Sequence, residues 1–326
     1  MIEVRNLTKV YPGAVAVDDV SFTVSKGEIV GFLGPNGAGK STTMKVLTCF
    51  IPPTSGAATV AGFDVVRQSL EVRRRVGYLP ENNPLYPEMR AEEYLEFRAT
   101  LHGLRGAGRA AAVGRAIEKC RLGDVRHRIV GQLSKGFRQR LGFADAIVHD
   151  PEIVILDEPT IGLDPNQVRH VREVIRELGQ ERTVILSTHV LSEVEKMCGR
   201  VLIINRGRLV ADGTPGEIIN RLTATGRIRL DLRGAPAGAR EALQRIPGVQ
   251  GVVENVRGND RAYLIDAKDG APIQPEIFRR AAEARWDVLE LAPERVSLED
   301  AFVELTDRPA GIPDALGAAE GKGGGA

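Results

Sequence analysis

The segment that constrains the fold most is a glycine-rich stretch, Gly34–Ser41, with the sequence GPNGAGKS. It fits the pattern G-x-x-x-x-G-K-[ST] between an expected strand at 28–33 and an expected helix at 41–50. The glycines let the backbone curl so that its N–H groups point at a phosphate, aided by the positive end of the following helix. The alternative is a glycine-rich turn that contains Lys and Ser by chance, but such a turn would not need both a strand before it and a helix after it. The stretch predicts a phosphate loop in an α/β fold, with Lys40 on the β- and γ-phosphates and the Ser41 hydroxyl on Mg²⁺.

The composition excludes several other classes of protein. The 326 residues are 43% hydrophobic and 27% charged, which suits about two globular domains and rules out disordered, collagen-like and disulfide-scaffold chains. Lysine and arginine total 44 against 43 aspartate and glutamate, so the net charge of +1 predicts neither a nucleic-acid binder nor an acidic protein. Three scattered cysteines indicate a reducing cytosol. We expect no signal peptide and no apolar run near the ~18 residues of a membrane span.

Apolar runs and turn signals predict alternating strands and helices in the first two thirds of the chain. Continuous apolar runs at 153–156, 184–186 and 201–204 are typical of strands buried on both faces of a parallel sheet. Segments with helical spacing, 166–178 and 191–197, lie between them. This alternation favours a parallel α/β sheet.

The rest of the chain has a different character. From 220 to 306 the pattern predicts strand, helix, two strands, helix, strand and a final helix, which suits a small α+β domain of the split βαβ type. Residues 307–326 are dominated by Gly, Ala and Pro, and we expect a disordered tail there. The expected domains are therefore 1–219, 220–306 and this tail.

A second motif is an apolar strand that ends in two carboxylates, Ile153–Glu158. Asp157 would hold Mg²⁺, because ligands bind outside the carboxyl ends of parallel strands. Glu158, one residue further on, could polarise the water that attacks a γ-phosphate. The alternative is a solvated acidic turn before Pro159, which the nearby phosphate loop makes less attractive.

Further motifs resemble those of ATP-binding cassette (ABC) ATPases. In chain order they are Tyr11 (like the residue that stacks on adenine), Gly77–Glu81 (Q-loop), Leu133–Arg140 (signature), Gly162–Pro165 (D-loop) and Ser187–His189 (switch histidine). All fall in the family's order within residues 1–219. The resemblance implies an α/β P-loop NTPase core of ABC type with a helical subdomain at about 90–141, plus a small C-terminal α+β accessory domain.

In this family two domains pack head to tail, with each ATP between the phosphate loop of one and the signature of the other. The resemblance implies that the Ser134 hydroxyl, at a helix N-terminus, and the Gly136 N–H face a γ-phosphate. It implies that His189 contacts the same phosphate and that Asp164 links the two sites. Because the chain has one set of motifs, we expect a homodimer, or a pair with a related ABC ATPase.

The resemblance also implies a full set of site residues, with ATP and Mg²⁺ as cofactors. Glu158 and His189 are the expected catalytic residues. The expected ATP-binding residues are Tyr11, Asn36, Gly37, Ala38, Gly39, Lys40, Ser41, Thr42, Ser134, Lys135, Gly136 and Asp164. The expected Mg²⁺ ligands are Ser41, Glu81 and Asp157.

Three residues depart from the commonest family pattern. Glu81 replaces the usual Gln, so it can offer an oxygen to Mg²⁺ but cannot donate as an amide does. Lys135 and Phe137 replace Gly and Gln in the signature. These variants resemble a subgroup of exporter-type ATPases that includes gliding-motility proteins. Because Ser134 and Gly136 remain, we expect hydrolysis to survive.

The function that this resemblance implies is ATP hydrolysis in an ABC transporter, coupled to substrate movement by separate membrane subunits. The subgroup favours export, and the protein is expected to be cytoplasmic and peripheral on the inner face of the cell membrane. One alternative is a soluble ABC ATPase of translation or DNA repair, but such proteins usually join two cassettes or carry a long coiled-coil insertion. Another is a binding module that uses ATP only to dimerise, which Glu158 and His189 argue against. No nucleic-acid partner is expected.

The expected contact with an integral membrane permease lies at residues 81–96. Within it, Pro84–Met89 offers apolar and aromatic side chains suited to an interface. Residues 81–96 contain five Glu and one Arg, which gives the whole stretch an acidic bias. We expect a short, partly basic helix of the membrane subunit to bind there.

Overall fold

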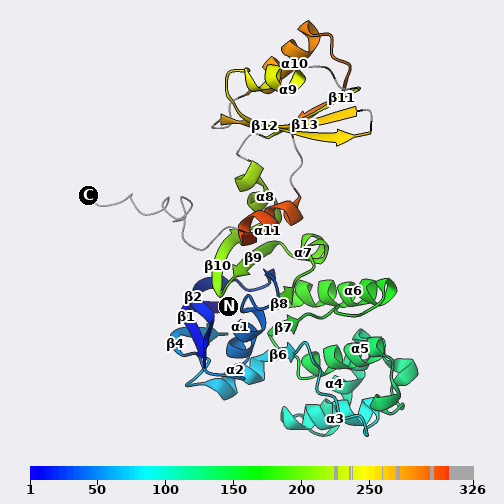
Figure 1. The fold of residues 1–326 in the computed structure, drawn as a ribbon. Coiled ribbons are helices and arrows are strands. Elements are labelled where there is room, and N and C mark those ends of the chain that lie inside the picture. Colours follow the sequence, from blue (N-terminus) through cyan, green and yellow to red (C-terminus); the bar gives the residue numbers. More distant parts are fainter. Residues whose placement is uncertain are drawn as a thin grey trace.

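The computed structural model describes residues 1–223, 227–234, 236, 238–258, 260–268, 272–293 and 297–307. The described residues form three sheets, and the central one has six strands in the order β10-β9-β3-β8-β7-β6 (Figure 1). Its strands are β3 (Ile29–Leu33), β6 (Val76–Leu79), β7 (Ile153–Asp157), β8 (Thr183–Thr188), β9 (Arg200–Asn205) and β10 (Arg208–Gly213). The pairs from β6 to β9 are parallel and β10 is antiparallel, so the expected parallel α/β sheet is confirmed.

The central sheet is covered on both faces, which explains its unbroken apolar strands. Within β7, Val154 and Leu156 join one buried cluster while Ile153 and Ile155 join another. Successive side chains of a strand point to opposite faces, so each face needs an apolar residue at every second position. The helices α5 (Lys135–Ile147), α6 (Pro165–Glu181) and α7 (Leu191–Met197) contribute to the first cluster, and α1 (Lys40–Leu47) contributes to the second.

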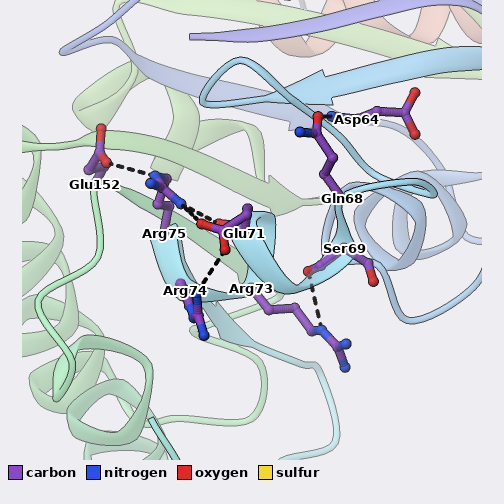
Figure 2. A network of polar contacts seen from close by, with 8 residues as sticks. All are labelled: Asp64, Gln68, Ser69, Glu71, Arg73, Arg74, Arg75 and Glu152. Atoms are coloured by element: carbon purple, nitrogen blue, oxygen red, sulfur yellow. Dashed lines mark hydrogen bonds and ion pairs between the residues drawn. The ribbon is translucent and has the colours of Figure 1, made fainter. Parts of the chain in front are cut away.

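An antiparallel sheet packs against the second cluster. Its strands, in the order β2-β1-β4-β5, are β1 (Ile2–Tyr11), β2 (Ala14–Val24), β4 (Ser55–Val60) and β5 (Phe63–Asp64). Helix α2 (Ser69–Arg75) connects this sheet to β6. Figure 2 shows how Arg75 attaches α2 to the central sheet: it pairs with Glu71 at 2.8 Å and with Glu152, next to β7, at 3.4 Å. The Arg75 guanidinium also lies 4.2 Å from the centre of the Phe63 ring.

Helices fill the region between β6 and β7. They are α3 (Ala91–Leu101), α4 (Gly106–Lys119) and α5, with single 3-10 turns at Gly123–Val125 and Val130–Gln132. The buried Asp145 of α5 fixes α3 to α5, because it accepts a hydrogen bond from the Tyr94 hydroxyl at 2.8 Å and one from Arg98 at 2.6 Å. A helical region therefore stands where the sequence predicts the helical subdomain.

The accessory domain has the predicted order of elements. After α8 (Pro215–Thr223) come β11 (Ile228–Leu232), α9 (Ala239–Gln244), β12 (Val249–Arg257), β13 (Asp260–Ala267), α10 (Gln274–Glu283), β14 (Val288–Pro293) and α11 (Leu298–Asp307). The strands form an antiparallel sheet in the order β12-β13-β11-β14. Helices α9 and α10 cover the face of this sheet that is away from the core (Figure 1), where Leu243 and Ile277 are fully buried.

Helix α11 packs on the ATPase core rather than on the accessory sheet. Leu298 and Ala301 are fully buried in the same cluster as Val194 of α7 and Ile218 of α8. The side chain of Asn205 in β9 donates a hydrogen bond to the Thr306 carbonyl at 2.9 Å. The packed βαββαβ unit therefore ends at β14, while α11 lies with the core. The boundary at 219/220 stays a prediction, and residues 308–326 of the expected tail lie outside the described residues.

Within the described part of the chain, no helix is long and apolar enough to cross a membrane.

The close approach of β6 to α5 gives a test of this packing. A Cβ at Gly77 would overlap the backbone carbonyl of Ala146, whereas a Cβ at the exposed Gly114 of α4 would meet nothing within 4 Å. We expect Gly77→Ala to lower the free energy of unfolding by about 1–3 kcal/mol through overpacking. Gly114→Ala, the matched control, should raise it by roughly 0.5–1 kcal/mol because alanine is the better helix former. Urea unfolding of both variants measures this, and equal midpoints would contradict the close approach.

Candidate functional site

The glycine-rich loop connects β3 to α1, as the sequence predicts. Gly37 and Gly39 have φ angles of 79° and 107°, in the left-handed region that side chains rarely adopt. A Cβ at Gly39 would also overlap the carbonyl oxygen of Ala16 in β2. Glycine is therefore required here, both for the turn and for the close approach of β2. The N-terminus of α1 follows directly and presents unpaired backbone N–H groups to the loop.

Lys40 lies inside this loop with only 6% of its surface exposed. Its Nζ donates to the carbonyl oxygens of Gly34 at 2.8 Å and Pro35 at 3.2 Å. It also lies 3.8 Å from a carboxylate oxygen of Glu158. A buried ammonium needs such partners, and the same group can attract the phosphates of a nucleotide.

Asp157, at the carboxyl end of β7, fits a metal ligand. It is 1% exposed, and its Oδ1 is buried with no hydrogen-bond partner among the described residues. A buried carboxylate oxygen left in this way is costly unless a cation satisfies it. Ser41, Glu81 and Asp157 line one cavity of about 620 Å³. Their oxygen donors are those that Mg²⁺ prefers, so the three predicted ligands fit this ion.

Glu158 has a strained backbone and two charged neighbours. Its φ of 50° is left-handed, and its N–H donates to the Ser187 carbonyl of β8 at 2.9 Å. Non-glycine residues in this conformation cost free energy and cluster at functional sites. The carboxylate is buried, and its oxygens lie 2.9 and 3.0 Å from Nδ1 of His189. Lys40, Glu158 and His189 therefore meet although 118 and 31 positions separate them in the chain.

These residues surround a second cavity of about 530 Å³. Its lining consists of Ala16, Asn36, Gly37, Gly39, Lys40, Ser41, Thr42, Glu81, Glu158, Ile161 and His189. Nine of these were predicted. Ala16 and Ile161 were missed, since a small or apolar residue in a loop carries no chemical signal.

Six of the predicted ATP-binding residues are not part of the described lining of this cavity, and the first two in the chain are Tyr11 and Ala38. Ala38 is 3% exposed, and its carbonyl accepts a hydrogen bond from the N–H of Gly207, so it supports the loop from behind. Tyr11, at the end of β1, is 38% exposed, with the Lys9 ammonium 5.4 Å from its ring centre. The stacking of Tyr11 on adenine stays a prediction.

The signature and the D-loop form a separate group. Ser134 is the N-cap of α5 and accepts a hydrogen bond from the Phe137 N–H at 3.4 Å. Asp164 is the N-cap of α6 and accepts one from the Gln167 N–H at 3.0 Å. The two helix ends touch, because a Cβ at Gly136 would overlap the Gln167 side chain.

A contact between the side chain of Lys135 and Gly162 joins the same two segments. In the described part of the chain, Ser134, Lys135, Gly136 and Asp164 do not line the cavity of the phosphate loop. The helix N-termini of α1 and α5 thus belong to two different groups of residues, and a helix N-terminus suits a phosphate.

Comparison with known proteins identifies the family. The model of the family described as "ABC transporter" matches residues 17–161. The daunorubicin/doxorubicin resistance ATP-binding protein DrrA of Streptomyces peucetius is 35% identical over 314 residues, covering 95% of this chain and 93% of that protein. The linearmycin resistance ATP-binding protein LnrL of Bacillus subtilis is 30% identical over 309 residues, covering 94% and 99%.

Solved structures agree with this assignment. The ATP-binding subunit of an ABC transporter has a TM-score of 0.63 and 32% identity over 68% of this chain and 93% of that one. A dimeric post-hydrolysis state of the ATP-binding cassette MJ0796, bound to ADP and Pi, has a TM-score of 0.61 and 25% identity over 66% and 98%. Since relatives match along nearly their whole length and the cassette fold is shared, the chain belongs to the ATP-binding proteins of ABC transporters and is an ATPase.

Proposed function

We propose that the protein is the ATP-hydrolysing subunit of an ABC exporter, and that it acts on separate membrane subunits at the inner face of the cell membrane. The relatives support export, since two are named for drug resistance and another, from Burkholderia orbicola, is named Nod factor export ATP-binding protein I. The observation that carries the catalytic part is the meeting of Lys40, Glu158 and His189 next to Asp157, whose Oδ1 lacks a hydrogen-bond partner among the described residues. These groups stand where a nucleotide phosphate and a water can lie together.

The working unit is a head-to-tail dimer. The phosphate loop of one protomer and the signature of its partner would enclose each ATP, because the signature residues of a single chain do not line its own phosphate-loop cavity in the described residues. The N-termini of α1 and α5 would then face the same triphosphate from opposite sides. A two-fold symmetric pair completes two sites at once.

Each site residue has a defined task in hydrolysis. The loop N–H groups and Lys40 bind the β- and γ-phosphates, and Ser41, Glu81 and Asp157 would hold Mg²⁺, which neutralises phosphate charge when bound. Glu158 accepts the proton of the attacking water. The hydrogen bond that His189 Nδ1 donates to the Glu158 carboxylate orients His189 toward the γ-phosphate. Asp164 supports the partner's site through the D-loop.

An aromatic surface beside Glu81 is the proposed contact with the membrane subunit. Tyr86 is 44% exposed, and its ring centre lies 6.0 Å from that of Tyr94 and 5.7 Å from that of Phe97. Leu85 and Met89 are half-buried beneath it and anchor the segment to the core. An exposed aromatic cluster on a fixed base is typical of an interface core.

The charge of this surface is less acidic than the sequence indicates. Glu92 pairs with Arg126, and Glu93 lies 3.7 Å from Arg90. Glu88, two residues after Tyr86, is exposed. A partly basic helix therefore fits best with a cation toward the Glu88 carboxylate.

The role of Glu158 can be tested by Glu158→Gln. Glutamine keeps the size of the side chain but cannot accept a proton, so turnover should fall roughly 100- to 10,000-fold while ATP binding remains. Sizing chromatography with ATP and Mg²⁺ should show the closed dimer accumulating. Glu152→Gln, at the other end of β7, is the matched control and should hydrolyse normally. If the rate of ATP hydrolysis by Glu158→Gln lies within a few-fold of that of the parent protein, the assignment of Glu158 as proton acceptor is wrong.

The phosphate loop and the signature predict different effects on nucleotide binding. Lys40→Ala should abolish binding of ATP to the monomer, because it removes the cation inside the phosphate loop. Ser134→Ala should leave monomer binding unchanged and impair dimer formation and turnover. Equilibrium binding of a fluorescent ATP analogue to dilute protein measures both. Equal losses of monomer affinity in the two variants would contradict a site shared between protomers.

The docking surface can be tested by crosslinking. In a Cys49→Ser background, Tyr86→Cys should crosslink to a multi-span membrane subunit in native membranes, with a yield that changes between nucleotide-free and ATP-bound states. Phe278→Cys, also exposed but on α10 of the accessory domain, is the control. Crosslinks from position 86 only to soluble proteins or nucleic acid would overturn the transporter proposal.

A further inference from the structure

Glu193 is a buried carboxylate that the proposed mechanism does not use. It lies on α7, is 3% exposed and accepts a hydrogen bond from the Thr160 hydroxyl at 2.6 Å. Its other oxygen lies 3.5 Å from a guanidinium nitrogen of Arg172 on α6. Carboxylates are seldom buried this completely unless a cation or a hydrogen-bond donor is paired with them.

The Thr160 partner belongs to the short loop that joins Glu158 to Asp164. Two turns shape this loop: the Ile161 N–H donates to the Glu158 carbonyl, and the Leu163 N–H donates to the Thr160 carbonyl, both at 3.2 Å. Any shift of Thr160 would therefore move the residues on both sides of it.

The loop is fixed from two directions. The side chain of Gln139, on the signature helix α5, donates to the Pro159 carbonyl at 2.8 Å and is itself buried. One residue later, Thr160 is held by Glu193 on α7. Helix α5, which carries the signature, and α7, the switch helix that follows His189, thus hydrogen-bond to adjacent residues, Pro159 and Thr160, directly after Glu158.

Arg172 extends the same contact to the D-loop helix. It lies on α6, whose N-cap is Asp164. Its Nε is buried with no hydrogen-bond partner in the part of the chain that the structure describes, and one of its terminal guanidinium nitrogens is the atom that lies 3.5 Å from Glu193. Glu193 follows His189 by four residues, and its N–H closes the first turn of α7 by donating to Val190 at 3.1 Å.

We propose that Glu193 is a positioning residue for ATP hydrolysis: through Thr160 and Arg172 it holds the loop of Glu158, the switch helix and the D-loop helix in one arrangement. It touches no reacting atom. It sets the distance between Glu158, which contacts the water, and His189, which contacts the phosphate. This inference rests on the roles proposed for those two residues.

The alternative is that Glu193, Thr160 and Arg172 form a buried polar cluster that only stabilises the fold. That role would lower the melting temperature and leave the turnover of the folded protein unchanged. A positioning role instead lowers kcat with little change in KM, because phosphate binding by the loop and Lys40 does not pass through Thr160. Misplacement of catalytic groups by about 1 Å can cost on the order of 100-fold in rate.

The test compares three threonine variants of the full chain, each assayed with ATP and Mg²⁺ well below its melting temperature. Thr160→Val removes the hydroxyl at nearly constant volume, and kcat should fall by about 10- to 100-fold with KM within about twofold. Thr160→Ser keeps the hydroxyl and should restore most of the turnover. Thr183→Val is the matched control: Thr183 is also buried, but its hydroxyl serves the Gly27 N–H at the opposite end of β8. It should lose stability and keep its kcat.

A double-mutant cycle then assigns the effect to Glu193. Glu193→Leu removes the acceptor oxygens at similar volume, and its loss of kcat should be less than additive with that of Thr160→Val, because both variants remove the hydrogen bond between Thr160 and Glu193. Normal kcat in Thr160→Val, or fully additive losses, would overturn the proposal. Glu158→Gln separates the failures: if it is inactive while Thr160→Val turns over normally, Glu193 is excluded and the assignment of Glu158 stands.

Discussion

The register of three parallel strands brings the phosphate loop, Asp157, Glu158 and His189 together. Leu33 at the end of β3 pairs with Thr188 at the end of β8, and Asp157 at the end of β7 pairs with Ser187. All three strands therefore end at one edge of the sheet. The phosphate loop, the two carboxylates and the switch histidine follow these ends within a residue or two. A shift of one residue in this pairing would exchange the side chains between the two buried faces of the sheet and separate the groups.

Asp157 and Glu158 are neighbours in the chain but occupy different environments. Asp157 keeps the regular extended backbone of β7, and its Oδ1 lacks a hydrogen-bond partner among the described residues. Glu158 turns into the left-handed region, which directs its carboxylate toward Lys40 and His189. A change in backbone conformation between adjacent residues thus gives two identical functional groups different partners. This separation underlies the proposed division between metal ligand and proton acceptor.

Much of the site could be predicted from the sequence because its residues follow strands directly. Apolar runs in the sequence predict the strands, and parallel pairing places the carboxyl ends of these strands at one edge of the sheet. Motifs that directly follow the strands are therefore expected to lie close together. The contact of Glu193 with Thr160 could not be predicted, since 33 residues separate them and no local pattern pairs a threonine with a glutamate. The position of α11 also escaped prediction, because the spacing of Leu298 and Ala301 shows which face is buried but not which surface covers it. Tyr11 was assigned by resemblance, and its sequence position does not fix where its ring lies.

The return of α11 to the core gives the accessory domain two points of attachment. The chain leaves the core through α8, builds the βαββαβ unit and comes back to pack beside α8 and α7. In topological terms the unit is an insertion between two helices that touch each other. The entropy of closing such a loop grows slowly with its length, and a folded insert with neighbouring ends reduces that cost further. An insert of another size could therefore replace this one during evolution. The pair α8 and α11 would stay intact, and α11 would still pack on α7.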